Sequence, residues 1–226
     1  ADGESCDRLV SSVLADHGHV DFLINNAGRS IRRGIEHSYD RFHDFERTMQ
    51  LNYYGSLRLI LGFLPGMAER RRGHVVNISS IGVLSNAPRF SAYVASKAAL
   101  DAFTRCAGSE FSDRNVRFTT INMPLVRTPM IAPTKMYDNV PTISSEEAAD
   151  MIVDAIINRP VRIATRLGVT AQILHLLAPK MTEVGMNTAF QMFPDSAAVK
   201  GKKAAGDHQP SPEQIALAQF TKGIHW

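Results

Sequence analysis

Apolar residues recur along this chain in two patterns, one typical of helices and the other of buried strands. Apolar positions three and four residues apart, with the usual helix start and stop signals, predict helices over 6–17, 39–50, 52–69, 91–111 and 145–158. Short, mostly apolar runs predict strands over 20–24, 74–79, 116–122 and 161–165. Because the run at 20–24 is almost continuously apolar, we expect it to be buried on both faces of a parallel sheet.

The most informative stretch joins the strand at 74–79 to the helix at 91–111. The strand is followed by Ser80, and the helix carries Tyr93 and, four residues later, Lys97. Residues four apart share one helix face, so the Lys97 ammonium can lie beside the Tyr93 phenol and lower its pKa. Such a tyrosine can exchange a proton with a carbonyl oxygen, which the Ser80 hydroxyl can also hold. The alternative for an isolated pair is a surface tyrosine packed under a lysine stem.

Two further features accompany this pair. The sequence NNAG follows an earlier strand at 25–28, and Asn52 lies at a predicted helix joint. Together with Ser80, Tyr93 and Lys97, they resemble the short-chain dehydrogenase/reductase family. The resemblance implies a Rossmann-like, doubly wound parallel sheet and an NAD(P)-dependent oxidoreductase. It assigns the catalytic roles to Asn52, Ser80, Tyr93 and Lys97.

The resemblance gives Asn52 a bend in its helix and a water that relays protons to Lys97. The alternative is a polar side chain that satisfies backbone groups at the helix joint, and the two roles are compatible. The resemblance further assigns cofactor contacts to Asn26, Ala27, Gly28, Tyr93, Lys97, Val126 and Thr128. Without it, 25–28 would be an ordinary strand-to-loop turn. Met123-Pro124 stands where the family has Pro-Gly, which changes the expected shape of the nicotinamide contact at Val126 and Thr128.

The family's opening strand and glycine-rich turn are not found upstream of residue 25. We therefore expect the chain to be truncated at its N-terminus, with the first three strands of the fold absent from the sequence. The predicted organisation is a partial Rossmann-type domain over 1–194 and a polar C-terminal tail over 195–226, partly disordered or forming a short helix. NADPH is expected in preference to NADH, although the family's selecting residue lies outside this sequence.

Composition and charge limit the kinds of binding site and the cellular compartment that we expect for this protein. A net charge of +3 with short basic runs favours solvated surfaces over a nucleic-acid interface. Two cysteines form no disulfide framework and have no neighbours at zinc spacing, so neither a metal site nor an oxidising compartment is expected. We expect a cytoplasmic protein with possible peripheral membrane contact.

The downstream sequence, at 122–130 and 162–168, is similar to the reductase domain of bacterial fatty acyl-CoA reductases. That resemblance implies reduction of a long-chain acyl-CoA to the aldehyde. The apolar, methionine-rich stretch at 169–193 is interpreted as an acyl-chain wall or membrane contact, or alternatively as a core helix pair or oligomer contact. The loop at 129–141 is expected to cover the substrate.

One alternative substrate class is 3-oxoacyl, steroid or other hydrophobic ketones. An alternative of another class is a non-catalytic, dehydrogenase-like oligomerisation module. The resemblance also implies a homodimer or homotetramer that packs through the helices at 52–69 and 91–111.

Overall fold

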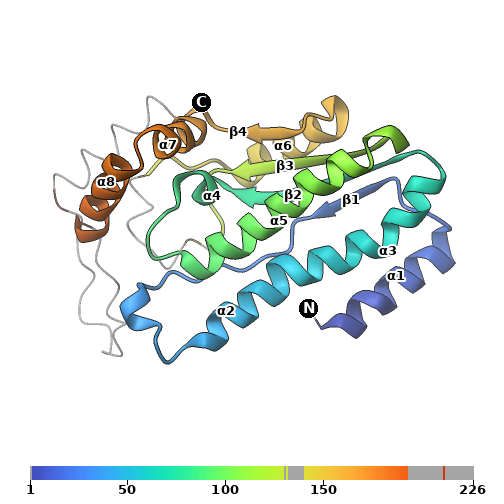
Figure 1. The fold of residues 1–226 in the computed structure, drawn as a ribbon. Helices are drawn as coiled ribbons and strands as arrows, with labels where there is room; N and C mark the ends of the chain where they lie inside the picture. Colours follow the sequence, from blue (N-terminus) through green and yellow to red (C-terminus); the bar gives the residue numbers. More distant parts are fainter. Residues whose placement is uncertain (1, 130, 132–139, 193–210, 212–226) are drawn as a thin grey trace.

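The computed structural model describes residues 2–129, 131, 140–192 and 211 (Figure 1). Its central feature is a parallel sheet in the order β1-β2-β3-β4. The strands are β1 (Phe22–Asn25), β2 (Gly73–Ser80), β3 (Val116–Met123) and β4 (Arg162–Ala164). The predicted α/β fold with a parallel sheet is therefore confirmed.

Helices cover both faces of the sheet and its carboxyl end. They are α1 (Gly3–His17), α2 (Phe42–Met49), α3 (Ser56–Glu69), α4 (Ile81–Ser85), α5 (Ser91–Glu110), α6 (Ser145–Asn158), α7 (Arg166–Leu177) and α8 (Pro179–Met192). Shorter turns are η1 (Ile35–His37) and η3 (Ser112–Arg114), and a π-helical segment, η2 (Gln50–Gly55), joins α2 to α3. Figure 1 shows α3 and α5 on one face of the sheet, α6 on the other, and α4, α7 and α8 beyond the carboxyl ends of the strands.

Two apolar cores lie on opposite faces of the sheet. Successive strand residues point to opposite faces, so Val75 joins the core with α3 and α5 while Val76 joins the core with α6. Ile60 and Val75 in the first core and Ile121 in the second have no exposed surface. Each such side chain contributes about 1.5–3 kcal/mol through burial, and both faces of the central strands are thereby held in place.

Helix α6 begins at a capping box, as its sequence predicts. The Ser144 hydroxyl accepts from the Glu147 amide at 3.1 Å, and the Glu147 carboxylate accepts from the Ser144 amide at 2.7 Å. Two amide groups that lack partners within the helix are thus satisfied. This cap fixes the point where the chain returns to the sheet after the 129–141 segment.

Strand β1 departs from the prediction that it is buried on both faces. Phe22 and Ile24 are 41% and 39% exposed, while Asn25 is buried. The reason is position: β1 is an edge strand of the described sheet, and α1 and α3 pack on the side that Leu23 faces. Continuous apolar sequence therefore predicted the strand correctly but not the exposure of its second face.

Helices α7 and α8 are also more exposed than a core helix pair would be. Their exposed apolar side chains are Val169, Ile173, Leu174, Leu176, Leu177, Met181 and Val184. The interpretation of this stretch as a core helix pair is therefore wrong, and its uses as an acyl-chain wall, a lipid contact or an oligomer contact stay predictions. Across the described residues, no helix combines the length and the apolar character needed to span a membrane.

Two predicted segments fall largely on undescribed residues. Most of the predicted substrate loop, 129–141, lies outside the described residues, as do the predicted tail and terminal helix apart from residue 211. The division into a domain over 1–194 and a tail over 195–226 stays a prediction.

A buried histidine makes the stability of this fold depend on pH. His74 on β2 is only 1% exposed, and its Nε2 lies 2.9 Å from the Thr119 hydroxyl. Since that hydroxyl donates to the Pro160 carbonyl, it accepts from Nε2–H, so the neutral ring carries its proton on Nε2. Burial, together with the Arg159 charge, lowers the pKa of His74 from 6.5 to about 4.

We predict that His74 makes the fold sensitive to acid. Below pH 6.5 the unfolded chain binds a proton that the folded chain resists down to about pH 4, so the free energy of unfolding falls across that window. The loss is on the order of 3 kcal/mol at about 1.4 kcal/mol per pKa unit. Denaturant unfolding at pH 7 and at about pH 4.5 should show a smaller loss for His74→Gln than for the unmodified protein. The control is His175→Gln, on an exposed position of α7; equal losses in all three proteins would contradict the assignment.

Candidate active site

The parallel register gathers polar residues at one edge of the sheet. Asn25 pairs with Asn77, and Ser80 pairs with Met123, so the chain leaves β1, β2 and β3 on the same side. Ligands of open α/β sheets bind at the carboxyl ends of the strands. The strand ends that carry 25–28, Ser80 and Asn122 are therefore the candidate site.

Ser80 is oriented by the helix that follows it. It is the N-cap of α4, and its hydroxyl accepts from the Gly82 amide at 3.1 Å. The same side chain hydrogen-bonds to the Tyr93 hydroxyl. The strand end and the start of α5 thus bring two hydroxyl groups to one point, as the sequence predicts.

Lys97 is buried one helical turn beyond Tyr93. It is 3% exposed, and its Nζ donates to the Ile78 carbonyl on β2 at 2.6 Å. Burial lowers the pKa of Lys97 to about 8 from its usual value of 10.5. The lysine therefore joins α5 to β2 and titrates unusually close to neutrality.

Tyr93 behaves differently from the sequence-based expectation. Burial raises its pKa above the usual value, and the hydrogen bond with Ser80 acts in the opposite direction without overcoming it. The expectation that Lys97 lowers the pKa of Tyr93 is therefore wrong in this structure. The physical reason is that the phenol is desolvated while the Lys97 ammonium is directed to the Ile78 carbonyl.

Asn52 lies in the π-helical segment η2 and is fully buried. Its Oδ1 accepts from the Arg29 amide at 2.9 Å, and its Nδ2 donates to the Arg29 carbonyl and the Ser96 hydroxyl, both at 2.9 Å. Ser96 in turn donates to the Tyr93 carbonyl at 2.7 Å. The expected joint between two helices at Asn52 is wrong, because 42–69 is one helix with a π-helical insertion, and the backbone groups that Asn52 satisfies belong to Arg29. The water relay stays a prediction.

Gly28 brings the turn at 25–28 close to Asn52 and Lys97. A Cβ placed on Gly28 would lie 3.3 Å from both the Asn52 Oδ1 and the Lys97 Nζ. Asn26 and Ala27, just before it, are exposed. An open turn that closely approaches a buried lysine fits the ribose of a nicotinamide cofactor, whose hydroxyls can accept from Nζ. The residues present therefore fit that part of the cofactor.

A buried amide ladder supports this turn from below. Asn25 donates to the Asn77 side chain at 2.8 Å, and Asn77 donates to the Thr104 hydroxyl at 2.8 Å. The ladder connects β1, β2 and α5, and its middle residue has no exposed surface. The sequence does not single out Thr104 and Ser96, because neither stands out from the other residues of its helix. Their partners come from distant segments.

Val126 and Thr128 lie on a separate segment after β3. Val126 pairs with Ile143 in a parallel bridge, and Thr128 donates to the Val126 carbonyl at 3.3 Å. Met123, at the position where the family has proline, is a buried residue of β3. Asn122 donates to the Ser80 carbonyl at 3.3 Å, while its buried Oδ1 has no hydrogen-bond partner within the described residues. An unpaired acceptor at this edge fits a ligand that donates hydrogen bonds.

No cluster of side chains suited to a metal ion occurs in the portion of the chain that the structure describes. The chemistry that this edge supports rests on hydroxyl groups and one ammonium. Ser80 and Tyr93 can both donate to a single oxygen atom, and Lys97 lies one helical turn beyond Tyr93. Such an arrangement stabilises a carbonyl oxygen that gains negative charge.

Comparisons with known proteins agree with this geometry. The sequence profile described as short chain dehydrogenase matches residues 1–138. The chain is 56% identical over 225 residues to a fatty acyl-CoA reductase of Acinetobacter baylyi, covering all of this chain and 75% of that protein. It is 51% identical to an uncharacterized oxidoreductase of Mycobacterium tuberculosis, covering 96% of this chain and 64% of that protein.

A solved structure gives the same result for the fold. A short-chain dehydrogenase from Streptomyces avermitilis superimposes with a TM-score of 0.69 at 28% identity, covering 83% of this chain and 76% of that one. Family membership favours an enzyme over the non-catalytic module considered from the sequence. The chain belongs to the short-chain dehydrogenase family and is an oxidoreductase of the type that uses a nicotinamide cofactor.

Proposed function

We propose that this enzyme reduces the thioester of a long-chain fatty acyl-CoA to the aldehyde with NADPH. The observation that carries the proposal is the 56% identity, over the whole chain, to a protein named fatty acyl-CoA reductase. A second relative with that name, from Mycobacterium tuberculosis, is 52% identical over 181 residues and is matched over 62% of its length. The exposed apolar side chains of α7 and α8 supply a surface suited to an acyl chain.

In this proposal Ser80 and Tyr93 hold the thioester oxygen. The chemistry supplied by a bound, reduced nicotinamide is a hydride for the carbonyl carbon. Tyr93 gives its hydroxyl proton to the oxygen, and Ser80 keeps that oxygen in place through a hydrogen bond. The raised pKa of Tyr93 keeps the phenol protonated at neutral pH, which suits a proton donor in the direction of reduction. Collapse of the resulting hemithioacetal then releases the aldehyde and the thiol.

Lys97 and Asn52 are proposed to assist the same proton transfer without holding the thioester oxygen themselves. Lys97 would grip the nicotinamide ribose near Gly28 and return a proton to Tyr93. Asn52 would complete the relay through a water, in addition to its bonds with Arg29. Asn26, Ala27, Val126 and Thr128 are proposed as further cofactor contacts; Asn26 and Ala27 are exposed, and Val126 and Thr128 are half-buried.

Oligomer formation also stays a prediction. The helical stretches at 52–69 and 91–111 were expected to pack against a second copy. In the structure, Leu61 on α3 is 55% exposed and Ala95 on α5 is exposed, so both helices offer apolar surface. A homodimer or homotetramer through them is consistent with this surface, and sedimentation of the full-length enzyme would decide it.

The proposed activity is tested with the purified full-length enzyme. We expect NADPH to be oxidised in the presence of palmitoyl-CoA, with release of the free thiol and of hexadecanal in equal amounts. Turnover with NADPH should exceed turnover with NADH. Reduction of a 3-oxoacyl thioester at its ketone, without thiol release from palmitoyl-CoA, would replace the proposal with the ketone reductase alternative.

Removing the Tyr93 hydroxyl should abolish proton donation. We predict that Tyr93→Phe lowers kcat by about 100-fold or more, because a positioned acid typically contributes that much. Tyr39→Phe is the matched control, since Tyr39 is 82% exposed and lies outside the site. Retention of more than a tenth of kcat in Tyr93→Phe, with aldehyde still formed, would remove Tyr93 from its proposed role.

The pH profile should report Lys97. Because its pKa is about 8, the ammonium is charged below that pH and neutral above it. We therefore predict that KM for NADPH is constant near neutrality and increases as pH rises through about 8. In Lys97→Arg the charge persists, so the increase should disappear even if kcat is reduced. The same increase in both proteins would show that another group titrates.

Gly28 provides a test of cofactor contact. A methyl group at this position would lie 3.3 Å from Lys97 Nζ and Asn52 Oδ1, which is tighter than ordinary contact. We predict that Gly28→Ala raises KM for NADPH several-fold while Tm changes little. Gly185→Ala is the control, because no atom lies within 4 Å of its added methyl group. An unchanged KM in Gly28→Ala would argue against ribose contact at this turn.

A further inference from the structure

Two buried polar atoms near the carboxyl end of the sheet lack a hydrogen-bond partner. They are the Oγ of Ser79 on β2 and the Oδ1 of Asn122 on β3, and neither bonds any described residue of the chain, including the other. Ser79 is 3% exposed and Asn122 has no exposed surface. A buried polar group without a partner destabilises a fold, so native proteins almost always supply one.

The two atoms belong to residues that lie directly opposite each other. In the parallel register of β2 and β3, Ser79 pairs with Asn122. Asn77, two residues before Ser79, bonds Thr104 on α5, so Ser79 and its partner Asn122 also lie on the face that α5 covers. Neighbouring strands are about 4.8 Å apart, a span that one water molecule bridges with two hydrogen bonds of about 2.8 Å.

The chemistry and the burial of these two atoms fit water as the ligand. An amide oxygen only accepts hydrogen bonds, whereas a serine hydroxyl both donates and accepts. A water molecule can therefore donate to the Asn122 Oδ1 and accept from the Ser79 hydroxyl at the same time. Because Asn122 has no exposed surface, a cofactor or substrate does not reach its Oδ1 in this fold. Buried waters are regular parts of globular proteins, and each bonds several polar groups that otherwise lack partners.

Asn122 connects this pair of atoms to Ser80. Its Nδ2 donates to the Ser80 carbonyl at 3.3 Å. The opposite orientation of the amide would place two acceptors, Oδ1 and that carbonyl, against each other, so this hydrogen bond determines that Oδ1 is the atom left without a partner. The Ser80 hydroxyl accepts from the Gly82 amide and bonds Tyr93. Holding the Asn122 amide therefore also holds the backbone of Ser80.

We propose that Ser79 and Asn122 bind one buried water molecule, and that Asn122 is thereby a positioning residue for Ser80. The water bonds the Asn122 Oδ1 and the Ser79 Oγ, so that the Nδ2 of the same amide stays directed at the Ser80 carbonyl. The effect on turnover rests on the function proposed above, whereas the water site follows from the fold.

The water site itself is tested by a high-resolution crystal structure of the full-length enzyme. We expect one density peak at about 2.8 Å from both the Ser79 Oγ and the Asn122 Oδ1. A direct hydrogen bond between these two side chains, or no density between them, would overturn the assignment.

The positioning role is tested by Ser79→Ala, which removes one of the two bonds of the water. We expect kcat with palmitoyl-CoA to fall about fivefold, the ratio implied by the loss of one hydrogen bond. KM for NADPH should stay within about twofold, because Ser80 is proposed to hold the thioester oxygen and not the cofactor. An unchanged kcat, or a rise in KM for NADPH without a fall in kcat, would remove the positioning role.

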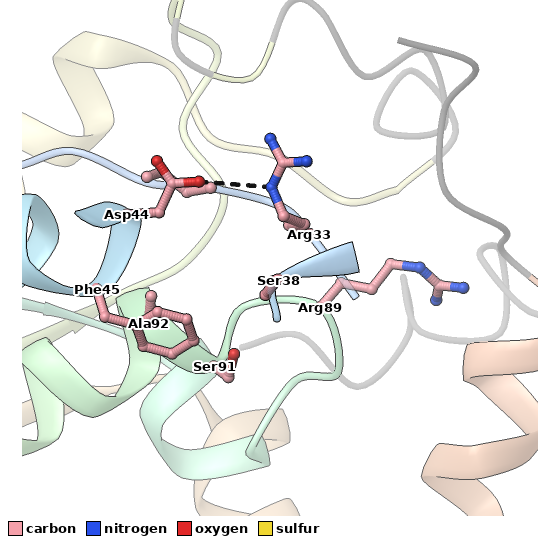
Figure 2. A pocket seen from close by; sticks show the side chains of 8 residues that line it. Arg33, Ser38, Asp44, Phe45, Arg89, Ser91 and Ala92 are labelled. Atoms are coloured by element: carbon pink, nitrogen blue, oxygen red, sulfur yellow. Dashed lines mark ion pairs between the residues drawn. The ribbon is translucent and has the colours of Figure 1, made fainter. Parts of the chain in front are cut away.

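Ser38→Ala is the matched control for this variant. The half-buried Ser38 donates from its hydroxyl to the Gly34 carbonyl at 3.0 Å, and it lines a pocket that includes neither Ser79 nor Asn122 (Figure 2). Its kcat should stay within about twofold of that of the unmodified enzyme. An equal fall in kcat in both serine variants would mean that the fall in Ser79→Ala is not specific to the water site.

A double-mutant cycle followed by thermal unfolding separates this proposal from the proposed function. Ser79→Ala should lower Tm by about 2–4 °C in the unmodified protein. In the Asn122→Ala background it should lower Tm much less, because the partner across the water is already gone. Equal losses in both backgrounds would show that no shared water links the two residues. If palmitoyl-CoA is not reduced but the density peak and this coupling appear, the proposed function fails and the water site stands.

Discussion

The burial of a single cation, the Lys97 ammonium, is the constraint on which the rest of the site depends. Its Nζ is desolvated between β2, α5 and the turn at 25–28, and it donates to the Ile78 carbonyl. A buried charge with so few partners is costly, and its lowered pKa measures that cost. The ammonium is directed to the Ile78 carbonyl and lies beside Gly28, where the oxygen atoms of a bound ligand would compensate for the lost solvent. Ionisable groups whose pKa is shifted by burial are typical of functional sites.

The surrounding elements are arranged so that this lysine has room and direction. Gly28 lacks the side chain that would press on Nζ, and Asn52 holds the backbone of Arg29 on both its amide and its carbonyl. Asn52 lies in a π-helical insertion, and its side chain bonds both Arg29 and Ser96. The geometry of the candidate site is thus built from long-range hydrogen bonds around one charge.

These long-range bonds mark the limit of what the sequence predicts. Periodicity predicts β2, β3 and α5 to within a residue or two. The spacing of Ser80, Tyr93 and Lys97 predicts carbonyl chemistry for them. It does not show that 42–69 is one helix with an insertion, because the partners of Asn52 in the insertion, Arg29 and Ser96, come from distant segments. Apolar composition likewise cannot tell which face of an edge strand stays exposed.

The raised pKa of Tyr93 could not be predicted from the sequence for the same reason. From sequence, proximity to Lys97 implies a lowered pKa, since residues four apart on a helix are neighbours. In the fold the phenol loses solvent while the ammonium points to Ile78, so desolvation dominates. The balance between a neighbouring charge and burial is set by where each side chain is directed, which spacing alone does not contain.

Hydrogen bonds connect the segment after the turn at 25–28 with the loop before α5. That loop contains Arg89 and leads to Tyr93, and the Arg33 amide donates to the Arg89 carbonyl. The segment from 29 to 41 begins at Arg29, whose backbone Asn52 holds. The segment that Asn52 holds at Arg29 is therefore bonded, four residues later, to the loop that leads into α5. Asn52 also donates to the Ser96 hydroxyl, which donates to the Tyr93 carbonyl, so one connected set of hydrogen bonds positions both Asn52 and the backbone of Tyr93.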